Sequence, residues 1–110
     1  RLILMALAES IEYDKIEVIG TYKAVQVRKA LVIKKDGVEI PGSRSYERYV
    51  LECGTLDASD ELVVNPLDKE PDGVTAIPDE VKNICNVVWT DTVKSAYKAY
   101  LIARKTLDSE

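Results

Sequence analysis

The residues best suited to chemistry lie in the acidic stretch LDKEPDGVTAIPDEV, residues 67–81. A calcium loop places oxygen ligands on alternate residues and a glycine at its sixth position, because the chain must wrap the ion and then bend sharply. A window of this stretch follows that spacing in positions one, three, five, six and twelve: Asp68, Glu70, Asp72, Gly73 and Asp79.

Three departures argue against calcium. Pro71 stands at position four, Glu70 is longer than the usual Asp or Asn, and Asp79 is shorter than the usual bidentate Glu. An acidic turn that leads into a helix explains the same residues, because carboxylates stabilise the positive end of a helix dipole. We therefore predict no metal and no cofactor, and retain one alternative, a calcium loop of Asp68, Glu70, Asp72 and Asp79.

Other catalytic residue types are scarce. The chain has no histidine, which excludes Ser-His-Asp and Cys-His catalysis within it. Two cysteines without histidine make a poor zinc site, so Cys53 and Cys85 are predicted to be free thiols. Acidic pairs such as Asp60 and Glu61 are usually solvated in loops. We predict no catalytic residues and no enzymatic activity.

Charge is segregated along the chain. Residues 21–50 carry seven basic and three acidic side chains, a net +4, whereas residues 51–80 carry one basic and nine acidic, a net −8. We favour contact between these segments, within or between subunits, over two surfaces for two partners. An alternative is a strand face that binds single-stranded nucleic acid, although the pI near 4.9 argues against it. Its residues would be Tyr22, Lys23, Arg28, Lys29, Arg44 and Arg48.

The first half of the chain has the pattern of strands. A strand near residues 10–19 changes its apolar parity, which predicts a kink near Asp14-Lys15. The stretch KAVQVRKALVIKK alternates, and Lys29 interrupts its apolar face, which predicts a bulge or an exposed edge. Asp36-Gly37 predicts a tight hairpin, and Pro41-Gly42 interrupts the returning strand.

Residues 54–78 contain three of the four prolines and read as an irregular acidic connection, with ELVV as one short candidate strand. Residues 79–105 are predicted helical from an apolar stripe that begins at Val81, Ile84, Cys85 and Val88. Because Thr90-Asp91 could cap a second helix, one long helix and a kinked pair both remain open.

These elements predict an α+β fold. An antiparallel sheet over about residues 10–53 is followed by the acidic connection and by one or two C-terminal helices packed on the sheet. A length of 110 residues suits a single domain over residues 1–110, of which residues 1–4 would precede a native start at Met5. No apolar run approaches the ~20 residues that span a bilayer, so no membrane partner is expected.

Three stretches carry a resemblance: EYDKIEVIGTYKAVQVRKALVIKKDGVEI, SRSYERYVLECGTLD and NICNVVWTDTVKSAYKAYL. They resemble small uncharacterised proteins encoded by marine bacteriophages, over residues 5–105. The resemblance carries over no catalytic motif and no functional residue. It implies a phage-encoded structural or accessory protein, an interaction or assembly module that resides in the host cytoplasm or the virion.

The apolar stripe of residues 79–105 is wide for a sheet of three or four short strands to cover. We therefore predict a homo-oligomer, in which an exposed patch contacts a second copy of the chain, and in addition an unidentified protein partner. The residues expected in this contact are Trp89, Tyr97, Tyr100 and Leu101.

Overall fold

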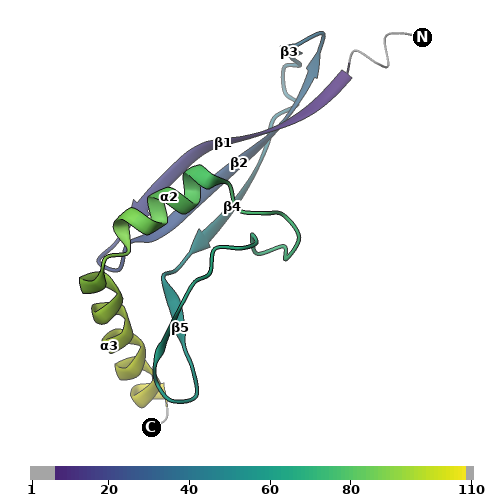
Figure 1. The fold of residues 1–110 in the computed structure, drawn as a ribbon. Helices are drawn as coiled ribbons and strands as arrows, with labels where there is room; N and C mark the ends of the chain where they lie inside the picture. Colours follow the sequence, from purple (N-terminus) through teal and green to yellow (C-terminus); the bar gives the residue numbers. More distant parts are fainter. Residues whose placement is uncertain (1–6, 109–110) are drawn as a thin grey trace.

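The computed structural model describes residues 7–108 and has the predicted α+β fold, with strands followed by helices (Figure 1). Its elements, in chain order, are β1 (Leu7–Ile19), β2 (Ala24–Lys35), β3 (Val38–Glu39), β4 (Ser45–Leu51), β5 (Gly54–Leu56), β6 (Leu62–Val64), α2 (Asp79–Val88) and α3 (Asp91–Asp108).

The main sheet is antiparallel, with β2 at its centre, β1 on one side and β3 and β4 on the other. The register of β1 against β2 shifts between Tyr13 and Lys15, which confirms the predicted kink as a bulge at Asp14. The prediction of a bulge or exposed edge at Lys29 is wrong, because β2 is paired there on both sides, with Tyr13 and with Glu47. The extra residue lies on β1 instead.

The hairpin between β2 and β3 turns where the sequence predicts. Asp36 and Gly37 both have positive φ, 54° and 81°, as a type I′ turn requires, and Lys35 pairs with Val38 across it. The returning strand is interrupted after two residues at Pro41-Gly42 and resumes as β4. The outer strand beside β2 is therefore built from two pieces, β3 and β4.

The connection over residues 54–78 is less irregular than predicted. Its first part forms a second sheet, in which β5 pairs with β6, the strand expected from ELVV. The Asp57 carboxylate closes the turn between them by accepting hydrogen bonds from the backbone of Ser59 and Glu61. A three-residue strand is too short to show an alternating apolar pattern, so β5 could not be recognised in the sequence.

The C-terminal third forms two helices, α2 and α3, and not one long helix, which were the two alternatives left open by the sequence. Trp89 leaves the helical conformation (φ −88°, ψ 70°), and its N–H caps the Cys85 carbonyl. Thr90 then accepts a hydrogen bond from the Val93 N–H and opens α3. Within residues 7–108, no helix is long and apolar enough to cross a membrane.

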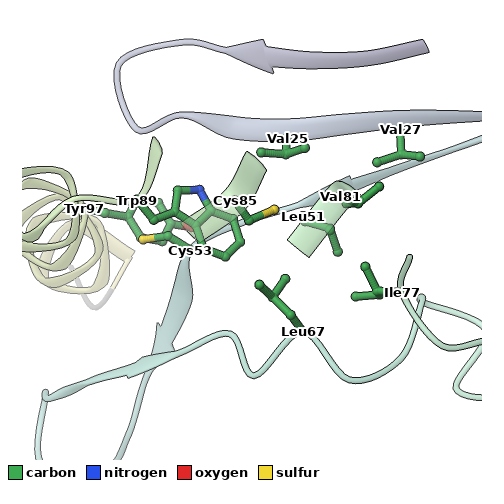
Figure 2. Packing of buried hydrophobic residues seen from close by; sticks show 10 residues of the cluster. All are labelled: Val25, Val27, Leu51, Cys53, Leu67, Ile77, Val81, Cys85, Trp89 and Tyr97. Carbon is green, nitrogen blue, oxygen red and sulfur yellow. The ribbon is translucent and has the colours of Figure 1, made fainter. Parts of the chain in front are cut away.

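The core lies between α2, the acidic connection and one face of the main sheet (Figure 2). We call this the helix-side face. The sheet contributes Val25, Val27 and Leu51 to the core, α2 contributes Val81 and Cys85, and the connection contributes Leu67 and Ile77, with Cys53, Trp89 and Tyr97 completing the cluster.

The core covers only part of this face, because the elements differ in length. The 12 residues of β2 extend about 40 Å, whereas the 10 residues of α2 extend about 15 Å. Figure 1 shows α2 over the part of the sheet nearest α3, while the part that carries β3 extends away from both helices. The molecule measures 64 × 27 × 22 Å, and its radius of gyration of 18.7 Å exceeds the ~13 Å of a compact domain of this size.

Candidate interaction surface

The part of the main sheet that extends away from the core, residues 7–13 and 29–47, forms an arm, and its helix-side face is uncovered beyond Lys29 and Tyr13. Its helix-side face follows from the register: side chains alternate along β2, and their partners on β1 and β3 point the same way. Five aliphatic residues lie on this face and are called the arm strip: Leu7, Ile11, Leu31, Ile33 and Val38. Glu9, which pairs with Ile33 on the edge strand β1, lies on the same face and is exposed.

The arm strip is exposed to solvent although its composition is that of a core. The exposed fractions are 43% for Leu7, 55% for Ile11, 37% for Leu31 and 69% for Val38. A shallow hollow of about 90 Å³ lies among Ile11, Leu31, Lys29 and Glu47, at the end of the strip nearest the core. Exposed apolar surface rimmed by charged residues, here Glu9 and Lys35, is typical of binding sites.

A buried polar cluster separates the arm strip from the core. The Glu70 side chain, 3% exposed, accepts hydrogen bonds on Oε2 from the hydroxyls of Tyr13 (2.8 Å) and Tyr49 (2.9 Å). The Lys29 ammonium, 12% exposed, lies 2.7 Å from Oε1. Both oxygens of the carboxylate are therefore satisfied, and its charge is balanced by a partner that is also buried.

This cluster attaches the acidic connection to the sheet. Burial, helped by the negative charge of Glu70, raises the pKa of Tyr13 to about 12 and holds the pKa of Tyr49 above its ordinary value. Both phenols therefore remain protonated donors near neutral pH. The Lys29 side chain, which interrupts the apolar alternation of β2, is the residue that allows Glu70 to be buried on this face.

Three of the four acidic residues of the calcium alternative, Glu70, Asp72 and Asp79, have other roles in the fold. Asp72 accepts hydrogen bonds from the Thr75 hydroxyl and from the N–H groups of Val74 and Thr75, which lower the pKa of Asp72 to about 2. Glu70 is held by Lys29, and Asp79 lies in the first turn of α2. Residues 7–108 contain no group of three or more His, Cys, Asp or Glu that could hold a metal ion.

The residues of the nucleic-acid alternative do not share one face. Arg28 forms two hydrogen bonds with Asp14 and lies over the Tyr46 ring on the face opposite the helices, whereas Lys29 points to the helix side. Arg44 pairs with Glu39 and Glu12. Arg48 lies across from Arg28, and Tyr22 and Lys23 lie in the β1–β2 turn.

The predicted interface of residues 89–101 requires a correction. Trp89 and Tyr97 are buried in the chain's own core, where the Trp89 indole donates to the Lys23 carbonyl and the Tyr97 hydroxyl donates to Glu52. Tyr100 is partly exposed, and Leu101 packs against the core. The stripe is covered at Trp89 and Tyr97 because the β1–β2 turn and the segment after β4 reach these two residues.

Two larger hollows lie outside the arm. One, of about 430 Å³, is bordered by the end of β4 and by the β5–β6 sheet. The other, of about 240 Å³, lies between the β1–β2 turn and α3, beside the rings of Tyr22, Tyr97 and Tyr100. Neither brings together an activated nucleophile and a base: the phenol of Tyr97 and the thiol of Cys53, which line the second hollow, both have pKa values raised by burial.

Comparison with protein-family models, with curated proteins and with solved structures finds no match for this chain. The residues of the arm strip escaped prediction, although one signal was present: the apolar parity of β2 continues beyond Lys29, through Leu31 and Ile33.

Proposed function

We propose that this chain is a non-enzymatic interaction or assembly module, a phage-type structural or accessory protein that binds a protein partner through the arm strip. Its main support is one observation: aliphatic side chains that belong in a core line a sheet face that no described part of the chain covers. Removing such surface from water is favourable by about 25 cal/mol per Å².

The Glu70 cluster supports the same proposal. If the whole helix-side face belonged to the core of this chain, an apolar segment of the same chain should also cover Leu31. Instead the acidic connection ends its contact with the sheet at Lys29, Tyr13 and Tyr49, with every polar group satisfied. The covered and the uncovered parts of the face are thus separated by a defined polar boundary.

Nucleic-acid binding has less support than a protein partner. Arg28, Lys29 and Arg44 are each paired with a carboxylate of the chain, so their charges are largely balanced before any phosphate arrives. The arm strip itself is aliphatic and carries no aromatic ring on which a base could stack.

Site-specific photocross-linking in the producing cells tests the proposal. A photoreactive phenylalanine analogue replaces Leu31 on the arm strip and, as a matched control, Tyr46 on the opposite face of the same arm. We expect a covalent adduct with protein, either another copy or a different chain, from position 31 and not from position 46. Equal labelling at both positions, or adducts with nucleic acid, would refute the proposal.

A further inference from the structure

We infer that the arm strip is covered by the arm strip of a second copy, packed face to face with the two arms antiparallel. This inference rests on the proposed function and specifies its partner. The tip of each arm would then lie against the base of the other.

The residues at the two ends of the strip follow from the register. At the tip, Leu7 and Val38 flank Lys35, and at the base, Tyr13 and Glu47 flank Lys29. Six residue steps along β2 separate Lys35 from Lys29, which is about 20 Å at ~3.3 Å per residue.

The position of α2 excludes the parallel arrangement. Two sheets that stack face to face lie about 10 Å apart, with their side chains interdigitated. Since α2 and the acidic connection lie on the same face beyond Lys29, arms that point the same way would drive α2 of one copy into α2 of the other. Antiparallel arms avoid this collision, because each covered region lies beyond the tip of the opposite arm.

Charge favours the antiparallel arrangement as well. A two-fold axis across the strip brings Lys35 of each copy to the base of the other, above Lys29, whose charge Glu70 already balances. Glu47 is exposed beside it, and Asp72 lines the adjoining hollow, so the base is acidic overall. The parallel arrangement would instead oppose the central-strand lysines, Lys35 to Lys35 and Lys29 to Lys29. An isologous interface must be self-complementary, and the antiparallel orientation is the one that brings the tip lysine of each copy to the acidic base of the other.

Shape agrees with the same arrangement. The hollow of about 90 Å³ at the base, among Ile11, Leu31, Lys29 and Glu47, would face the tip of the partner copy. An aliphatic side chain of that tip, Leu7 or Val38, would enter it. The neighbouring Ile33 and Leu31 of the two copies would meet at the centre of the contact.

The contact is small, so the dimer should be weak. A strip about 20 Å long and three strands wide, at ~4.8 Å between strands, covers a few hundred Å² per copy. This is below the ~800 Å² per partner of a standard stable interface, so the dimer should dissociate in the micromolar range or above. Measurements must therefore extend from about 1 μM to about 1 mM chain.

Sedimentation equilibrium of the purified chain is the first test. The mass should rise with concentration from the 12.3 kDa of one chain toward twice that value. Leu31→Glu should abolish the rise, because it buries a charge at the centre of the contact. Val87→Glu is the matched control, since Val87 is an exposed valine on α2 outside the arm, and it should leave the rise unchanged.

Charge reversal tests the orientation. Lys35→Glu and Glu47→Lys should each weaken the dimer by about 2- to 30-fold, since each places like charges together twice per dimer. Combining the two substitutions in one chain should restore the wild-type dissociation constant.

Three outcomes would overturn the inference: a mass of 12.3 kDa at every concentration, a double variant weaker than either single variant, or an intrachain cross-link from position 31 to residues 1–6. If the purified chain is monomeric but still cross-links to another protein in cells, the inference is refuted and the proposed function is retained.

Discussion

Replacing Glu70 with leucine should strongly destabilise the chain. The substitution leaves the Lys29 ammonium nearly buried and without its carboxylate, and it leaves the hydroxyls of Tyr13 and Tyr49 without their acceptor. Removing one partner of a buried ion pair costs about 3–5 kcal/mol, and each unsatisfied buried hydroxyl adds about 1–3 kcal/mol. The free energy of unfolding of a domain of this size is only about 5–15 kcal/mol, so most of its stability would be lost.

The compensating substitution separates charge from packing. Lys29→Met in the Glu70→Leu background removes the orphaned charge and should recover several kcal/mol of the free energy of unfolding. Tyr13→Phe alone should cost about 1.5–3 kcal/mol, because it loses one hydrogen bond to a charged acceptor.

Urea unfolding followed by fluorescence measures these differences. Trp89 is the single tryptophan and lies in the core, so its emission reports the packing of α2 on the sheet. A Glu70→Leu variant within ~0.5 kcal/mol of wild type would refute the account of the cluster, since that is the range of ordinary surface substitutions. A Lys29→Met/Glu70→Leu double variant as unstable as Glu70→Leu alone would refute it as well.

Three further predictions concern other parts of the fold. Gly37→Val should lower the free energy of unfolding by about 1–2 kcal/mol, seen as a lower melting temperature, because Gly37 has φ +81° while nothing lies within 4 Å of an added Cβ. Gly54→Ala should loosen the β5–β6 sheet and speed amide exchange there, since the new Cβ would clash with the Val63 carbonyl oxygen. Cys53 and Cys85 should resist alkylation at pH 8 until the chain unfolds, because both are buried and burial raises the pKa of Cys85 to about 11; labelling of the native chain within minutes would contradict this.

Local features of the fold could be predicted from the sequence because a few neighbouring residues determine them. Asp36-Gly37 specifies a turn with positive φ at both positions, and the change of apolar parity around Asp14 specifies a bulge. Thr90 marks the start of α3 through its own hydroxyl. In each case the physical cause lies within a few residues of the effect.

The partners of residues far apart in the chain could not be predicted in this way. Lys29 and Glu70 are 41 residues apart, and only the fold brings the lysine beneath the acidic connection. The predicted interface was wrong at Trp89 and Tyr97 for the same reason. From the sequence these residues exceed what the sheet could cover, whereas in the structure they are buried and the β1–β2 turn lies against Trp89. The arm strip was missed because alternation shows which side chains share a face but not how far a helix extends over it.

Small-angle X-ray scattering over a concentration series tests the central claim most directly, because it reports the length of the particle together with its mass. Two molecules of 64 Å that overlap along an arm strip of about 20 Å give a dimer about 110 Å long. We predict this maximum dimension at high concentration, and a return to 64 Å in the Leu31→Glu variant. A dimer that stays near 64 Å, or a particle with the mass of one chain at every concentration, would contradict the account.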